Sequence, residues 1–114
     1  MALPVFDISM SEDDLDKIAK KAEAASSFLK AISHEGRLMI LCHLTTGEKS
    51  VTELENLLSA RQAAVSQQLA RLRFEGFVSA RRDGKAIYYS LADDRTKRVL
   101  EVVYDLFCGD EANT

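Results

Sequence analysis

Residues 50–91 read SVTELENLLSARQAAVSQQLARLRFEGFVSARRDGKAIYYSL, and this segment determines the fold. It opens with a capping box, because the Ser50 hydroxyl can cap a helix N-terminus and the Glu53 carboxylate can reach back to the Ser50 amide. Two segments with apolar residues at helical spacing follow, with a polar break at 59–61 between them. This pattern predicts a helix-turn-helix.

A β-hairpin is predicted directly after these two helices. Residues 78–82 and 86–91 alternate as strands do, and Asp83-Gly84 lies between them. Asp-Gly is typical of a type I′ turn, which joins two antiparallel strands tightly. Because the hairpin is rich in arginine and lysine, we expect a basic wing beside the helix-turn-helix.

The second predicted helix has one face suited to a core and one suited to DNA. Val65, Leu69 and Leu72 recur at helical spacing and predict the buried face. The opposite face is small and rich in amides. Gln can bond an adenine edge twice, Ser can bond several bases, and Ala leaves room for a thymine methyl group. We therefore expect this face in the major groove, the alternative being a helix that is merely solvated.

The expected DNA contacts divide between the helix and the wing. Helix residues are expected at base edges, and the cations of the wing at phosphates or in the minor groove. The alternative for the wing is a solvated hairpin without a partner. The predicted DNA-binding residues are Arg61, Gln62, Ala63, Ser66, Gln67, Arg71, Arg81, Arg82 and Lys85.

The distribution of charge supports a DNA partner although the chain of 114 residues has a net charge of −3. Residues 61–85 hold six basic and two acidic side chains, so the net positive charge is confined to the predicted DNA-binding region. Salt screens charges over roughly 10 Å, so phosphates respond to this local excess more than to the total. The length predicts a single domain over 1–114, with an ordered core at about 12–108.

Three further helices are predicted around this region. Ser11 and the acidic residues after it predict the start of a first helix, and Ser33 the cap of a second that ends near Gly47. A last helix is expected to begin at Asp93 or Asp94 and to stop at Gly109. The fold class is mainly α with a small β-hairpin: a winged helix-turn-helix of four helices, two strands and a last helix. The long apolar faces of the first and last helices predict a homodimer.

The sequence resembles the ArsR/SmtB family of winged-helix repressors over roughly residues 12–108. Three stretches carry the resemblance: AISHEGRLMIL at 31–41, VSQQLARL at 65–72 and RDGKAIYYSL at 82–91. The resemblance implies a homodimer that binds double-stranded operator DNA and releases it when an inducer binds. It also implies that the protein is not an enzyme and does not bind a membrane. The sequence has no apolar run long enough for a membrane span and no secretory signal, so we expect a cytoplasmic protein.

Many members of that family sense metals, but this sequence lacks the usual ligands. The family's thiolate site has a Cys-x-Cys where residues 50–52 read Ser-Val-Thr, and its other common site needs His in the last helix, where residues 93–108 have none. Hydroxyls are poor ligands for metals that prefer thiolate or imidazole. We therefore expect no metal and no cofactor, and a metal sensor with a non-standard site stays an alternative.

The two cysteines, Cys42 and Cys108, are 66 positions apart. By spacing alone, each is most simply a small buried apolar residue. The resemblance extends to the persulfide-responsive subgroup of the family that includes SqrR and BigR, in which two cysteines in these helices sense reactive sulfur. It implies that persulfides link Cys42 and Cys108 through a polysulfide or tetrasulfide bridge and derepress sulfide-metabolism genes.

Other functions are left open by the residues themselves. A peroxide-driven disulfide switch would use the same two thiols and differ only in the oxidant. A thiol oxidoreductase is disfavoured because the chain has no Cys-x-x-Cys and no alternation of strands and helices. A winged helix that contacts only proteins is the remaining alternative.

Overall fold

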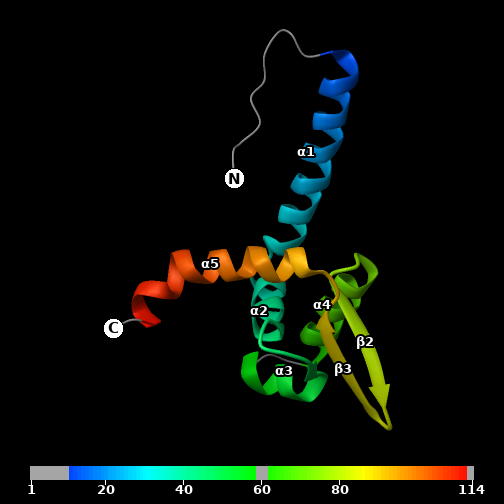
Figure 1. Ribbon diagram of the computed structural model, residues 1–114. Helices are drawn as coiled ribbons and strands as arrows, with labels where there is room; N and C mark the ends of the chain where they lie inside the picture. Colours follow the sequence, from blue (N-terminus) through cyan, green and yellow to red (C-terminus); the bar gives the residue numbers. More distant parts are fainter. Residues whose placement is uncertain (1–10, 59–61, 113–114) are drawn as a thin grey trace. The chain divides into compact units, whose positions relative to one another are not determined.

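The computed structural model describes residues 11–58 and 62–112, and within these ranges the chain forms five helices and three strands (Figure 1). The predicted winged helix-turn-helix is confirmed, with one strand more than expected. The chain divides into two compact units, residues 1–32 and 33–114. Each unit is described by itself, and the single domain over 1–114 stays a prediction.

The first unit contains α1 (Glu12–Ile32). The helix begins where predicted, because the Ser11 Oγ accepts a hydrogen bond from the Asp14 amide at 3.1 Å. The first turn is acidic, which suits the positive end of the helix dipole. Burial is confined to Ala31 and Ile32 at the end of the helix, so the rest of α1 presents its side chains to solvent or to a partner.

The second unit begins with α2 (Glu35–Leu44), and its cap corrects the prediction of Ser33. The capping residue is His34, whose Nδ1 accepts hydrogen bonds from the Gly36 amide at 3.1 Å and the Arg37 amide at 3.4 Å. An imidazole nitrogen can take the role of a capping oxygen because either atom accepts from an unpaired amide of the first turn. After the helix, Gly47 has a φ of 133°, a conformation that favours glycine.

The helix-turn-helix consists of α3 (Val51–Leu58) and α4 (Gln62–Phe74). The capping box forms as predicted: the Glu53 amide donates to the Ser50 Oγ at 3.1 Å, and the Ser50 amide donates to the Glu53 Oε1 at 3.0 Å. The predicted buried face of α4 is confirmed. Its three apolar residues are at most 2% exposed, and they share the core with buried residues of α2 and α3, namely Val65, Leu69, Leu72, Ile40, Leu41, Leu44 and Leu54.

The wing is part of a three-stranded antiparallel sheet of β1 (Lys49–Ser50), β2 (Val78–Asp83) and β3 (Ala86–Leu91), in the order β1-β3-β2. The strand β1 was not predicted, because two residues are too short to show a period. The turn also differs from the prediction. Asp83 pairs with Ala86, so the two turn residues are Gly84 and Lys85, and Gly84 has a φ of 63°. Glycine at the first central position suits the twist of tight hairpins.

The last helix, α5 (Asp94–Ala112), begins at one of the two predicted residues. The Asp93 Oδ1 accepts a hydrogen bond from the Arg95 amide at 2.8 Å and caps the helix. The predicted stop at Gly109 is wrong, because α5 continues through that glycine to Ala112. An internal glycine costs a helix only about 1 kcal/mol relative to alanine, which is too little to end it.

The two halves of α5 have different surroundings within the second unit. Thr96 and Leu100 are each 1% exposed, so the first half packs against the core. The second half extends beyond the other elements of this unit (Figure 1). Its large apolar side chains are exposed, with Phe107 at 80%; they are Val102, Tyr104, Leu106 and Phe107.

Candidate nucleic-acid interface and cysteine pair

The outer face of α4 is free of the core, as a helix that enters a groove of DNA must be. Ser66, Gln67 and Arg71 are exposed on the opposite side of the helix from the buried leucines. Arg71 is partly neutralised, because its Nε lies 3.0 Å from the Glu75 Oε1. Arg61 lies outside the described residues, as do the side chains of Gln62 and Ala63 in the first turn of α4.

A cleft of about 360 Å³ lies between the helix-turn-helix and the wing. It brings together Ser66 of α4 and Lys85 of the wing, two predicted DNA-binding residues from distant parts of the sequence. The residues lining the cleft are Ser50, Val51, Thr52, Glu55, Ser66, Lys85, Ala86, Ile87 and Tyr88. The hydroxyl groups at the start of α3 and the Lys85 ammonium are suitable donors to phosphate oxygens.

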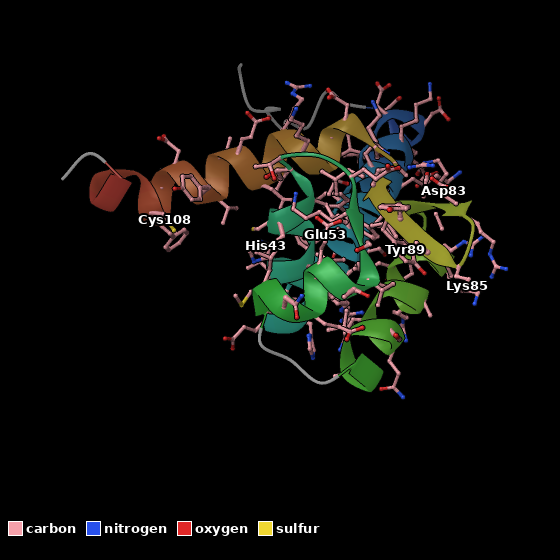
Figure 2. All side chains as sticks on the ribbon, turned by 90° about the horizontal axis from the view of Figure 1, so that it is seen from below. His43, Glu53, Asp83, Lys85, Tyr89 and Cys108 are labelled. Carbon is pink, nitrogen blue, oxygen red and sulfur yellow. The ribbon has the colours of Figure 1, made fainter. Side chains whose placement is uncertain are left out.

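The two neighbouring arginines of the wing differ in their partners. Arg81 donates from Nε to the Glu48 Oε2 at 3.1 Å and from Nη2 to the Glu48 Oε1 at 2.6 Å. Its guanidinium carbon also lies 4.9 Å from the centre of the Tyr88 ring, an arrangement typical of a cation–π contact. Arg82 and Lys85 are exposed, and within the described ranges neither forms an ion pair. Figure 2 shows Lys85 at the wing.

Glu48 was missed by the sequence interpretation, because it precedes the helix-turn-helix and lies 33 positions from Arg81. The sheet brings the two residues together, since β1 follows Glu48 directly and pairs with β3. Hydrogen bonds from Arg81 lower the pKa of the Glu48 carboxyl below its ordinary value, and those to Glu48 raise the pKa of Arg81. Glu48 therefore stays charged at neutral pH and offsets the charge of Arg81.

The two cysteines are free thiols and both are half-buried, Cys42 on α2 and Cys108 on α5. Burial raises the pKa of the Cys42 thiol above its ordinary value, and the charge of the Cys108 thiolate raises that pKa further. Cys42 of α2 and Tyr104 of α5, one helical turn before Cys108, line one cleft, so the fold brings together the two helices that carry the thiols. Figure 2 shows Cys108 on α5 and His43, the residue after Cys42, on α2.

A second cleft, of about 660 Å³, gives access to Cys42 between the end of α2 and the middle of α5. Its lining combines apolar side chains with hydroxyl, imidazole and carboxylate groups. The lining residues are Cys42, His43, Thr45, Thr46, Leu100, Glu101, Tyr104 and Asp105. Cys108 follows Tyr104 by one helical turn, on the same face of α5.

The described residues hold neither a metal-binding cluster nor a membrane span. In residues 11–58 and 62–112, no three His, Cys, Asp or Glu side chains lie together as a metal site requires. None of the helices described is both long and apolar enough to cross a membrane.

The fold, the exposed face of α4 and the basic wing define a winged helix-turn-helix protein. Residues 34–80 match the model of the arsR family of bacterial regulatory proteins. The biofilm growth-associated repressor of Agrobacterium fabrum is 42% identical over 106 residues, which cover 93% of this chain and 91% of that protein. The chain belongs to the arsR family of bacterial regulatory proteins.

Solved structures of related proteins agree with this assignment. The transcriptional repressor BigR from Xylella fastidiosa has a TM-score of 0.76 at 38% identity, over 87% of this chain and 98% of BigR. Reduced HlyU from Vibrio cholerae has a TM-score of 0.78 at 38% identity, over 82% of this chain and 98% of HlyU. The matched proteins are transcriptional regulators rather than enzymes.

Proposed function

We propose that this protein is a dithiol sulfur-sensing transcriptional repressor. The reduced homodimer binds operator DNA, and reactive sulfur species link Cys42 to Cys108 and release the DNA, which derepresses sulfide-metabolism genes. The observation that carries the proposal is the cleft that Cys42 of α2 shares with Tyr104 of α5, one helical turn before Cys108, although the two cysteines are 66 positions apart in the sequence. The similarity to a repressor of Agrobacterium fabrum supports repression as the mode of action.

DNA binding in the proposal uses two surfaces of each protomer. The α4 residues Gln62, Ser66 and Gln67 contact base edges, with Ala63 beside a thymine methyl group. Cations contact phosphates or the minor groove; these are Arg61, Arg71, Arg81, Arg82 and Lys85, of which Arg81 contributes less because Glu48 holds its guanidinium. The exposure of Ser66 and Gln67, and the cleft that Ser66 shares with the wing, support this division. A protein that binds an operator acts in the bacterial cytoplasm, where thiols are kept reduced.

The homodimer forms through α1 and α5. The second half of α5 exposes apolar side chains that a monomer in water would leave unburied, among them Leu106 and Phe107. An isologous dimer buries the same face from both copies and places two recognition helices in half-sites about one helical turn of DNA apart. The exposed face of α5 supports this arrangement.

The sulfur chemistry needs no oxidant besides a persulfide, R–S–SH. The Cys42 thiolate attacks the outer sulfur, a new S–S bond forms, and R–S⁻ leaves with the electron pair, so that Cys42 becomes Sγ–SH. A second transfer to this persulfide lengthens it to Sγ–S–SH. The Cys108 thiolate then attacks the middle sulfur and expels the terminal one as HS⁻. The product of two transfers is a trisulfide between α2 and α5, and a third transfer before closure gives a tetrasulfide.

A bridge between the thiols would weaken DNA binding through the geometry of the dimer. α2 packs against α4, the recognition helix, whereas α5 carries the proposed dimer face. A bridge fixes α2 relative to α5 and so changes the separation of the two recognition helices. Coupling between two sites in proteins is typically about 1–3 kcal/mol, or roughly 5- to 150-fold in affinity.

The experiment that tests the proposal is operator binding by the wild type, Cys42→Ser and Cys108→Ser. DNA is first selected from genomic fragments by the reduced protein, and affinity is then measured after treatment with persulfide, peroxide or a simple disulfide. Release by persulfide from the wild type alone, with added sulfur mass in the bridged product, supports the proposal. Release by peroxide with no added sulfur identifies a disulfide switch instead. Release from both serine variants contradicts any dithiol mechanism.

A further inference from the structure

The cleft that leads to Cys42 has an unequal balance of charge. Two of its lining residues, Glu101 and Asp105, are carboxylates on successive turns of α5. His43 is the one lining side chain able to carry a positive charge, and just outside the lining the Lys49 ammonium donates a hydrogen bond to the Thr46 hydroxyl at 3.2 Å. Any molecule that reaches the Cys42 sulfur through this cleft passes beside these groups.

The two carboxylates are exposed to the solvent that fills the cleft. In the described part of the chain, no lysine or arginine forms an ion pair with either one. The Leu100 side chain, which also lines the cleft, is buried at 1% exposure and offers no compensating donor. The charges of Glu101 and Asp105 therefore act on a ligand in the cleft, reduced by solvent, by salt and by the nearby cationic groups of Lys49 and Arg98.

We infer that Glu101 and Asp105 make Cys42 selective for sulfur donors that carry an ammonium group over donors that carry carboxylates. This inference rests on the proposed function, in which Cys42 accepts sulfur, and it specifies the class of donor. The volume of about 660 Å³ leaves room for donors of either charge, so charge rather than size makes the distinction. In the cleft, the donor's ammonium group lies near the carboxylates while Cys42 attacks the sulfur.

The test measures access to Cys42 with two symmetrical disulfides of similar size and opposite charge, cystamine and 3,3′-dithiodipropionate. In Cys108→Ser, the Cys42 thiolate attacks one sulfur, R–S⁻ leaves, and a mixed disulfide forms whose mass identifies it. Each rate is divided by the rate of the same reagent with N-acetylcysteine amide, a thiol without a charged group. We expect cystamine to be favoured about tenfold, because one pair of unit charges about 4 Å apart in water already changes a rate roughly fivefold.

Isosteric variants and salt separate the local carboxylates from the general charge of the protein. Glu101→Gln and Asp105→Asn, each made in the Cys108→Ser background, are expected to lower the cystamine preference by about threefold each. The matched control is Glu35→Gln, which removes one exposed carboxylate of α2 outside the cleft and is expected to leave the preference unchanged. In the parent variant the preference should fall as salt rises.

The outcomes distinguish this inference from the proposed function. Equal normalised rates for the two disulfides, or a preference that Glu35→Gln lowers as much as Glu101→Gln does, overturn the selectivity. Failure of persulfide to release operator DNA overturns the proposed function and leaves the measured selectivity intact. A preference for cystamine that both cleft variants lower and salt weakens supports the inference.

Discussion

The wing offers a direct comparison between two adjacent arginines, Arg81 and Arg82. Both are predicted to bind DNA, but the Arg81 guanidinium is held by both oxygens of Glu48, whereas Arg82 has no ion pair within the described residues. We predict that Arg82→Ala lowers the salt dependence of operator binding and that Arg81→Ala changes it much less. The reason is that an arginine already paired with a carboxylate displaces few cations from the DNA.

The size of the effect follows from how many phosphates the variant no longer binds. Each phosphate neutralised by a cation adds about 0.9 to the slope of log affinity against log salt concentration, and the proposed dimer has two wings, so Arg82→Ala should lower the slope by about 1.8. Over a fourfold rise in salt, from about 50 to about 200 mM, that difference amounts to roughly twelvefold in relative affinity. Glu48→Gln is expected to raise the slope, since it releases Arg81 for a phosphate.

The assay is fluorescence anisotropy of labelled operator DNA titrated with reduced protein at a series of KCl concentrations. The same titration with non-operator DNA shows whether the weakening is independent of sequence, as expected of a phosphate contact. Two results would disprove this interpretation of the wing. If Arg81→Ala lowers the slope as much as Arg82→Ala does, the ion pair between Arg81 and Glu48 breaks when the protein binds DNA. If Arg82→Ala leaves the slope unchanged, Arg82 does not contact phosphates.

Three further predictions concern the recognition helix, the core and the reactive thiol. Gln67→Ala should weaken the cognate operator and change base preference at one position per half-site by about 1–3 kcal/mol, as measured by binding to single-base operator variants; a uniform weakening on all sequences would contradict a base contact. Leu69→Ala should lower the free energy of unfolding by about 2–5 kcal/mol in urea titrations, because this side chain is 0% exposed, and a decrease below about 1 kcal/mol would contradict its place in the core. Cys42 has a raised pKa and hence less thiolate at neutral pH, so its alkylation rate should rise at a higher pH in the folded protein than in the urea-unfolded chain. In Cys108→Ser, the pH at which Cys42 alkylation speeds up should shift only part of the way toward its value in the unfolded chain, because burial is the larger cause of the raised pKa. A complete shift to the unfolded value would show that burial is not the larger cause.

Local signals made most of the fold predictable from the sequence. The capping box at Ser50 and Glu53 needs only two side chains three residues apart, and both of its hydrogen bonds form. The spacing of Val65, Leu69 and Leu72 fixes a buried helical face regardless of what covers it, and all three residues are in the core. Such features are encoded within a few residues, so the sequence alone suffices to locate them.

The features that the sequence did not predict depend on which of two candidate side chains caps a helix, or on pairing between residues distant in the sequence. His34 caps α2 where Ser33 was expected, because either side chain can accept from the first turn and only the path of the backbone selects one. β1 exists because Lys49 and Ser50 pair with Tyr89 and Tyr88 of β3, far along the chain. Gly109 does not end α5, because the helix stability lost at a glycine is small compared with the stabilisation from the backbone hydrogen bonds that continue through it.

The candidate site was predictable by residue type but not by arrangement. Positive charge near residues 61–85 indicated a DNA-binding region, yet nothing local distinguishes Arg81 from Arg82; the pair with Glu48 follows from the sheet. The acidic cleft at Cys42 likewise requires α2 and α5 to be side by side. The two cysteines were selected from the resemblance to a family, and the effect of Cys108 on the pKa of Cys42 emerges only once the chain is folded.

Whether a sulfur bridge between Cys42 and Cys108 releases DNA is decided by determining mass and operator affinity on one sample. The reduced dimer is titrated with persulfide, the intact mass gives the bridged fraction, and anisotropy gives the affinity of that same sample. We expect the affinity to fall roughly 5- to 150-fold as the bridged fraction approaches completion, and to recover when dithiothreitol removes the bridge. Fully bridged protein that binds the operator as tightly as reduced protein would show that the bridge does not control DNA binding.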